Sequence, residues 1–232
     1  MYNIKALRGT MFCPQINYTQ NFVSELNELL QGYVPVLIAQ DTGNFVPTIP
    51  TWRLSSSDED EVILFNADKI DIILKIDAPI EDVSIVSFAN HCKLVFEKIL
   101  SIKGYVSTRL ALAPTLVVAE NGIRPDSLYK RLFAIQEFQH SCPEISNVSQ
   151  VFRVNKLICG NDVKVNFVAN FHLANGILFI NGNNQIRESY LCDFDINTMA
   201  NQGYKFGIDE MKNFFDISVE NFKSFYNLYF SK

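Results

Sequence analysis

The alternation of apolar and polar residues between positions 149 and 196 constrains the fold more than any other feature of this sequence. Every odd-numbered residue in 163–173 is apolar, and every even-numbered residue in 186–196 except Glu188 is apolar. Successive side chains of a β-strand point to opposite faces, so each run predicts a strand with one apolar and one polar face. The turn-type sequences Gly-Asn-Asp, Asn175-Gly176 and Asn-Gly-Asn-Asn separate four such runs, at 149–159, 163–173, 177–180 and 186–196. We therefore predict a four-stranded antiparallel meander in this part of the chain.

A sheet with one apolar face needs a cover, and amphipathic helices can provide it. Apolar residues recur at helical intervals in 19–32, in 84–103 and in the final segment 207–232. A shorter helix is expected to begin near Pro125, because proline is tolerated in the first helical turn. The predicted fold class is α+β, with an antiparallel β-sheet packed against a few amphipathic helices.

Both halves of the chain place strands first and a helix later. We expect an N-terminal α+β half at 1–140, and a C-terminal half at 141–232 that contains the meander and the final helix. The sequence leaves open whether these are two related halves or parts of one continuous domain.

The distribution of charge argues against nucleic acid as a partner. The net charge is −5 and the Lys and Arg residues are scattered, whereas a nucleic-acid binder usually presents a basic face. Five cysteines without a Cys-x-x-Cys pair indicate a reducing compartment. No apolar run reaches the length of about 18 residues that a membrane helix needs. We expect a cytoplasmic protein that does not enter a membrane.

The glycines give no sign of a nucleotide cofactor. Neither Gly-x-Gly-x-x-Gly nor Gly-x-x-x-x-Gly-Lys-Ser/Thr occurs, and these are the loops that commonly cradle phosphates. We therefore expect no cofactor.

Asp193 and Asp195 share the polar face of a predicted strand, and two interpretations are open. Such a face ordinarily meets water in an antiparallel sheet. Alternatively, the two carboxylates and His172 form a metal site, which would make the chain a metal-dependent hydrolase or nuclease-like enzyme. A further pair, Cys142 and His140, could act as nucleophile and base.

The aromatic residues of the final helix form a stripe wider than one face. Such a stripe is either core or an interaction surface, because aromatic residues dominate interfaces. A homodimer would bury any excess. The candidate interaction residues are Phe214, Phe215, Phe222, Phe225, Tyr226 and Tyr229.

Three stretches resemble a sporadically distributed family of uncharacterised bacterial proteins of similar length. These are the Trp-containing strand and hairpin at 51–74, the helix and strand at 96–114, and an Asp-alternating strand followed by a Phe-rich helix, at 192–226. In the family's Gly-Leu-Arg-Tyr-like stretch, this chain matches only Arg109-Leu110. The order of sheet and helix is also similar, in topology alone, to the SecB-like chaperones, which bind extended apolar segments. The first resemblance implies a bacterial source and no established activity.

These observations favour a non-enzymatic, protein-binding or chaperone-like protein whose partner is another protein, a further copy of the chain, or both. The metal-dependent enzyme at Asp193 and Asp195 is the alternative. Binding of a small molecule between sheet and helices is a third possibility that the sequence does not separate from the first.

Overall fold

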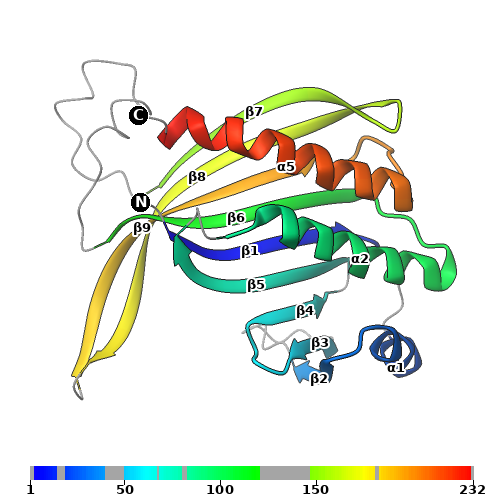
Figure 1. The fold of residues 1–232 in the computed structure, drawn as a ribbon, viewed down its shortest axis with the longest axis horizontal. Helices are drawn as coiled ribbons and strands as arrows, with labels where there is room; N and C mark the ends of the chain where they lie inside the picture. Colours follow the sequence, from blue (N-terminus) through cyan, green and yellow to red (C-terminus); the bar gives the residue numbers. More distant parts are fainter. Residues whose placement is uncertain are drawn as a thin grey trace, which may run out of the picture.

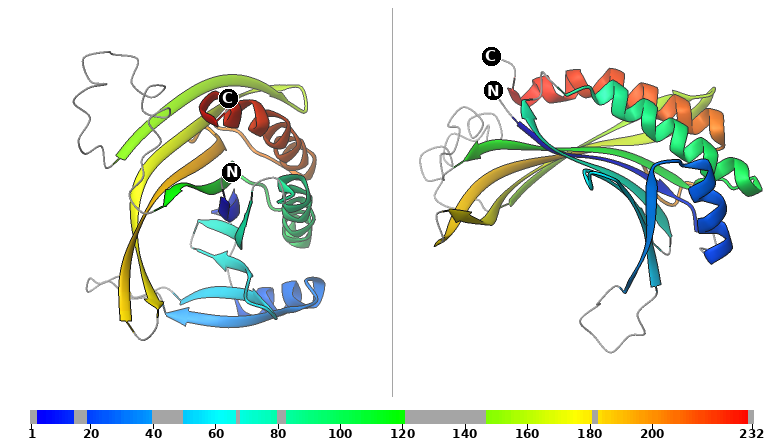
Figure 2. Two further views of the ribbon diagram at one scale, coloured as in Figure 1. Left: turned by 60° about the vertical axis from the view of Figure 1, so that its left-hand side comes forward. Right: turned by 60° about the horizontal axis from the view of Figure 1, so that its bottom comes forward.

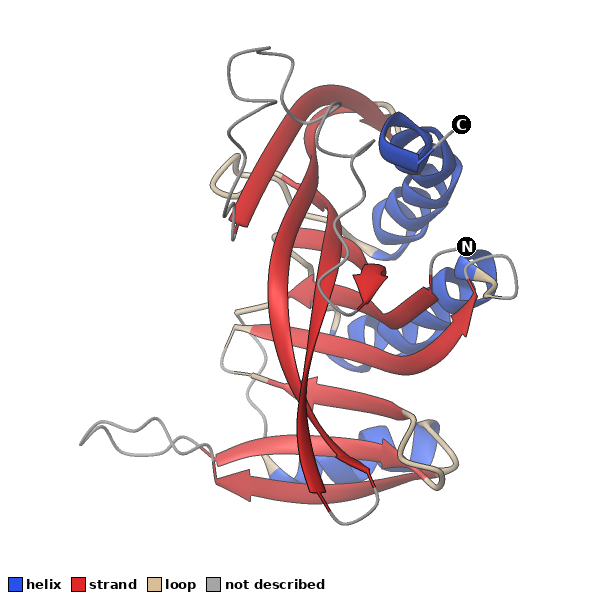
Figure 3. Ribbon diagram, turned by 90° about the vertical axis from the view of Figure 1, so that its left-hand side faces the viewer, coloured by secondary structure: helices blue, strands red, loops and turns tan. Residues whose placement is uncertain are grey.

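In the part of the chain that the structure describes, one antiparallel sheet of nine strands is covered on one face by three helices (Figures 1 and 3). The computed structural model describes residues 3–14, 19–39, 50–66, 68–79, 83–120, 147–180 and 183–230. The strand order is β2-β3-β4-β5-β1-β6-β9-β8-β7. The predicted α+β class is confirmed.

The elements are named here in chain order. The first half contains β1 (Asn3–Phe12), α1 (Gln20–Leu29), β2 (Tyr33–Ala39), β3 (Pro50–Ser56), β4 (Glu61–Phe65), β5 (Lys69–Pro79), α2 (Ile85–Lys103) and β6 (Arg109–Glu120). The second half contains β7 (Asn147–Ile158), β8 (Asn161–Ile180), β9 (Asn183–Thr198) and α5 (Ile208–Phe230).

The sheet is continuous across the boundary between the two expected halves. Strand β1 lies at its centre and pairs with β5 on one side and β6 on the other. Strand β6 in turn pairs with β9, for example through Thr115 and Asp193. Strands from 1–140 and from 141–232 therefore belong to one sheet.

Side chains at the start of each described helix accept hydrogen bonds from backbone amides there, and a glycine ends α2. Thr19 and Ser84 accept hydrogen bonds from backbone amides in the first turns of α1 and α2, as N-caps do. Gly104 ends α2 with a left-handed φ of 63°, which glycine adopts without steric cost. Glu210 accepts a hydrogen bond from the amide of Gly207 at the start of α5.

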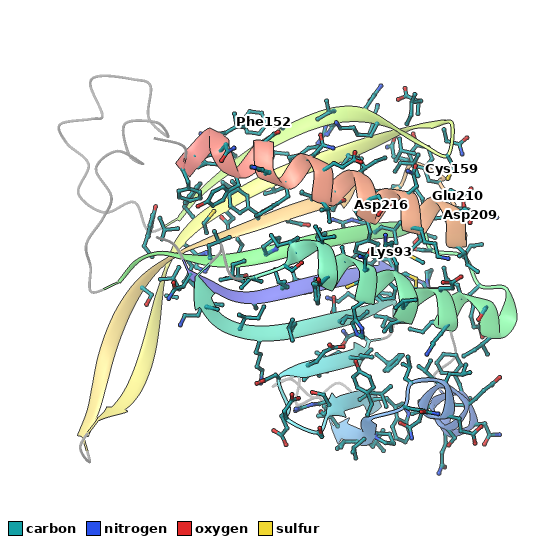
Figure 4. All side chains as sticks on the ribbon, viewed as in Figure 1. Lys93, Phe152, Cys159, Asp209, Glu210 and Asp216 are labelled. Atoms are coloured by element: carbon teal, nitrogen blue, oxygen red, sulfur yellow. The ribbon has the colours of Figure 1, made fainter. Side chains whose placement is uncertain are left out.

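Helices α2 and α5 lie side by side on the sheet (Figure 2). Two ion pairs join their outer surfaces, Lys93 to Asp216 and Lys212 to Glu97, each at 2.6 Å. Figure 4 shows Lys93 and Asp216 on neighbouring turns of the two helices. None of the helices in the described part of the chain combines the length and apolar character needed to cross a membrane.

Aromatic side chains fill the space between α5 and the C-terminal strands. Phe194 of β9 is fully buried. Its ring centroid lies 5.6 Å from that of Phe222, 4.9 Å from Phe225 and 5.8 Å from Tyr229. The pairs with Phe222 and Phe225 are edge-to-face, and such pairs are worth about 0.5–1.5 kcal/mol each beyond the area they bury.

The C-terminal meander has three strands instead of the predicted four. Asn175 and Gly176 do not form a turn: both lie within β8, where they pair with Glu188 and Arg187 of β9. The chain reverses after Ile180 instead, and β8 and β9 form one long hairpin (Figure 3). An Asn-Gly pair favours a turn locally, but a partner strand that extends beyond it can satisfy its backbone in the ladder.

Several expectations fall on residues that the structure does not describe. The helix near Pro125 and the pair formed by His140 and Cys142 all lie within 121–146, outside the described residues.

Candidate functional site

Asp193 and Asp195 lie on the sheet face opposite the helices, here called the polar face. Strand alternation sends Phe194, between them, into the core against α5. Thr115 of β6 donates a hydrogen bond to Asp193 Oδ1 at 2.6 Å, and Asn197 Nδ2 donates to Asp195 Oδ2 at 2.8 Å. The predicted assignment of faces along this strand is therefore correct.

The three expected metal ligands do not come together as one set. His172 Nδ1 lies 3.5 Å from Asp193 Oδ2, while Asp195 is held by Asn197 two residues further along β9. Among the described residues, no three His, Cys, Asp or Glu side chains are grouped so that they could hold a metal ion. The arrangement gives no support to a site made from these three residues.

The two aspartates instead line a hollow in the polar face with a volume of about 530 Å³. We call it the polar hollow. Its lining includes Arg8 on β1, Ala113 and Thr115 on β6, Asn170 on β8, and Asp193 and Asp195 on β9.

The surroundings of Asp195 disfavour the ionised form of its carboxyl group. Burial raises the pKa of its carboxyl group, against the opposing effects of Arg109, Arg8 and the hydrogen bond from Asn197. Its second oxygen, Oδ1, is buried and has no hydrogen-bond partner among the described residues. Buried polar atoms without partners are rare and call for an explanation.

The aromatic residues expected to bind a partner are mostly core. The structure buries five of them, Phe214, Phe215, Phe222, Phe225 and Tyr229, under the sheet and leaves Tyr226 half-buried. The prediction that this stripe forms an interaction surface is thus wrong for those five side chains. The sheet is wide and curved enough to cover more than one helix face, which helical periodicity alone does not reveal (Figure 2).

Exposed apolar side chains gather on the two edge strands of the sheet, three on β2 (Val34, Val36 and Leu37) and four on β7. Val151, Phe152, Val154 and Leu157 are exposed by 54%, 45%, 44% and 68%. Strand β7 pairs with β8 on one side, and no described strand pairs with its other side. Figure 1 shows β7 at the margin of the sheet, with α5 running beside it.

Helix α5 forms one wall beside this edge. Lys156 of β7 donates a hydrogen bond to Asn221 at 2.7 Å, and the ring of Phe152 packs edge-on against Phe225 at 6.2 Å. Leu228 lies two turns beyond Asn221 on the same side of the helix and is more than half exposed. Phe152, labelled in Figure 4, therefore lies between the strand edge and the exposed side of α5.

A second polar cluster went unpredicted because its members come from three distant elements. Tyr33 of β2 donates a hydrogen bond to Glu61 of β4, and His91 Nε2 of α2 lies 2.6 Å from the same Glu61 oxygen. Burial and Glu61 raise the pKa of Tyr33. No local pattern links these residues, so only the fold could reveal the cluster. Its three polar groups satisfy one another and join α2 to the β2–β4 corner of the sheet.

Comparison of the sequence with protein-family models and with curated proteins found no match. The family resemblance and the topological likeness described above therefore stay predictions.

Proposed function

We propose that this chain is a non-enzymatic protein-binding module that binds a β-strand of another protein chain along the free edge of β7. The observation that supports the proposal is that Val151, Phe152, Val154 and Leu157, which lie on both faces of β7, are exposed on a strand whose outer side pairs with no described strand. An unpaired strand edge offers backbone hydrogen bonds to an incoming strand, and alternate side chains give specificity.

Features that normally protect an edge strand are weak on β7. The strand is 12 residues long, contains no proline and carries two charged residues, Arg153 and Lys156. The opposite edge of the sheet, β2, is seven residues long and is interrupted by Pro35. Short length, proline and charge are the usual defences against unwanted strand pairing. Of the two edges, β7 is thus the better suited to accept a strand.

The structure favours a second copy of this chain as the occupant, because β7 is complementary to itself. Even-numbered residues of β7 face the helices and odd-numbered residues face the polar side. An antiparallel pair related by a two-fold axis must match even with even and odd with odd.

One self-pairing register suits the side chains best. With Val154 on the two-fold axis, Val151 lies opposite Leu157, Phe152 opposite Lys156, and Arg153 opposite Asn155. Apolar residues then meet apolar residues, and each cation meets an aromatic or amide group.

Shifting the axis to Arg153 would place two guanidinium groups face to face, which is destabilising. We therefore expect an isologous dimer with one sheet running through both copies.

Sedimentation equilibrium of the purified protein tests the proposal. The wild type is expected to dimerise, and Val154→Lys is expected to weaken the dimer at least about tenfold, because it places two ammonium groups opposite each other. Val86→Lys is the matched control, since Val86 lies on α2 and is exposed to a similar degree, 54% against 44% for Val154.

Each outcome bears on the proposal. Dimer loss in Val154→Lys with an unchanged Val86→Lys supports it. A wild type that is monomeric at every concentration, or a dimer that both variants leave intact, overturns it.

A further inference from the structure

The polar hollow places opposite charges on either side of a small residue. Arg8 of β1 pairs with Ala113 of β6, and the register of β6 with β9 puts Asp195 on the far side of Ala113. Arg8 and Asp195 thus lie on strands two apart, about 10 Å between backbones. Because Ala113 carries only a methyl group, the space between the two charges is not filled by protein.

The next row of the sheet adds a second carboxylate, without a second cation. Ala6 of β1 pairs with Thr115 of β6, which pairs with Asp193 of β9. The carboxylates of Asp193 and Asp195 therefore stand on the same wall of the hollow, opposite Arg8. Thr115, already bound to Asp193, fixes the orientation of that carboxylate.

Charged groups on both walls of the hollow are accessible to a ligand. The guanidinium group of Arg8 is exposed and has no hydrogen-bond or ion-pair partner among the residues that the structure describes. The side chain of Asp193, on the other wall, is 39% exposed. Asp195 lines the same wall, although its Oδ1 atom is buried. A ligand that carries both a donor and an acceptor would contact both walls.

We propose that the polar hollow binds a small zwitterion of the free amino acid class. Its ammonium group donates a hydrogen bond to Asp193 and lies beside the carboxylate of Asp195, and its carboxylate accepts two hydrogen bonds from the guanidinium of Arg8. The body of the ligand lies over Ala113, and Asn170 is placed to bind a polar side chain.

Charge balance distinguishes this ligand class from simple ions. A lone cation at the aspartates would leave Arg8 unpaired, and a lone anion at Arg8 would face two carboxylates. A zwitterion satisfies both walls at once. The raised pKa of Asp195 is consistent with this, because an ammonium group beside the carboxylate would favour its ionised form.

Ligand pairs that differ by one charge test the proposal on the wild-type protein. The common L-amino acids are first screened by thermal unfolding, and the best of them is titrated calorimetrically beside its carboxamide and its N-acetyl derivative. The carboxamide lacks the anionic group and the N-acetyl derivative lacks the cationic group. Both are expected to bind at least about tenfold more weakly than the parent amino acid.

Protein variants test the assignment of each wall. Arg8→Gln is expected to abolish the preference for the free acid over the carboxamide, and Asp193→Asn the preference for the amine over its acetyl derivative. Arg153→Gln is the control, because Arg153 lies on the same face but outside the hollow. It should bind as the wild type does.

The proposal is overturned if no amino acid raises the unfolding temperature or gives a binding isotherm. It is also overturned if the carboxamide and acetyl derivatives bind as tightly as the parent. This test needs no dimer, so its failure would leave the role proposed for β7 untouched.

Discussion

Replacing Gly9 by alanine probes the closest approach of helix α2 to the sheet. A Cβ atom on Gly9 of β1 would lie 2.5 Å from Cys92 Sγ and 3.7 Å from Phe215 Cε1. Cys92 and Phe215 are both fully buried, so neither side chain has room to move away. Overpacking a well-packed core costs about 1–3 kcal/mol.

Whether Gly9→Ala lowers or raises the free energy of unfolding shows which is larger, the steric clash with Cys92 or the preference of a strand for alanine over glycine. Without the clash, Gly→Ala in a strand would stabilise by about 0.5–1 kcal/mol. The sulfur atom sits close to the α2 backbone, so we place the clash in the upper part of its range, about 2–3 kcal/mol. We therefore expect Gly9→Ala to lower the free energy of unfolding by about 1–2 kcal/mol.

Truncating Cys92 should reverse that effect. In a Cys92→Ala background the sulfur is gone, and Gly9→Ala is expected to be neutral or stabilising. The coupling energy between the two sites would then be about 2 kcal/mol, within the range found for residues in contact. Urea unfolding of the wild type, both single variants and the double variant measures it. If Gly9→Ala stabilises the wild type, or if its effect is the same in both backgrounds, the packing of α2 on β1 described here is wrong.

Two further predictions concern the polar groups. Burial raises the pKa of Asp195 above its value in the unfolded chain, so its contribution to stability is present at acid pH and is lost as the carboxyl ionises. Asp195→Asn should therefore gain stability relative to the wild type as the pH rises from about 3.5 to 7; urea unfolding at both pH values measures this, and a gain that is independent of pH would contradict it. Tyr33→Phe removes the hydroxyl that binds Glu61 and should cost about 1 kcal/mol. Amide exchange should become faster mainly in β2, and a uniform change across the sheet would show that the cluster does not hold that corner.

The sequence predicted those features that depend on local periodicity. The prediction of which side chains of β8 and β9 face the helices was correct, because apolar and polar residues alternate along both strands, as in Asp193, Phe194 and Asp195. The helix predicted at 84–103 depends on an equally local signal, the recurrence of apolar residues at helical intervals, and it corresponds to α2.

Features that depend on distant partners could not be predicted. Whether Asn175-Gly176 forms a turn depends on how far β9 extends beside β8. How much of the α5 stripe is covered depends on the width of the sheet, which brings in strands from both halves of the chain. The polar hollow needs Arg8, Ala113 and Asp195 to fall in one row, and only the pairing of β1, β6 and β9 achieves that.

Disulfide trapping at the edge of β7 tests the proposed role most directly. With Val154 on the two-fold axis, the Cα atoms of two Val154→Cys residues would lie about 4.5–5.5 Å apart, which a disulfide can bridge. The exposed Cys159 and also Cys142, which lies outside the described residues, are first replaced by serine.

Leu157→Cys in the same background is the control. In this register its two copies are separated by six positions along the strands, about 20 Å. We predict that Val154→Cys gives a cross-linked dimer under mild oxidation, that Leu157→Cys alone does not, and that mixing Leu157→Cys with Val151→Cys restores the cross-link. Absence of a Val154→Cys dimer, or equal cross-linking of Val154→Cys and Leu157→Cys, would contradict strand addition at β7 in this register.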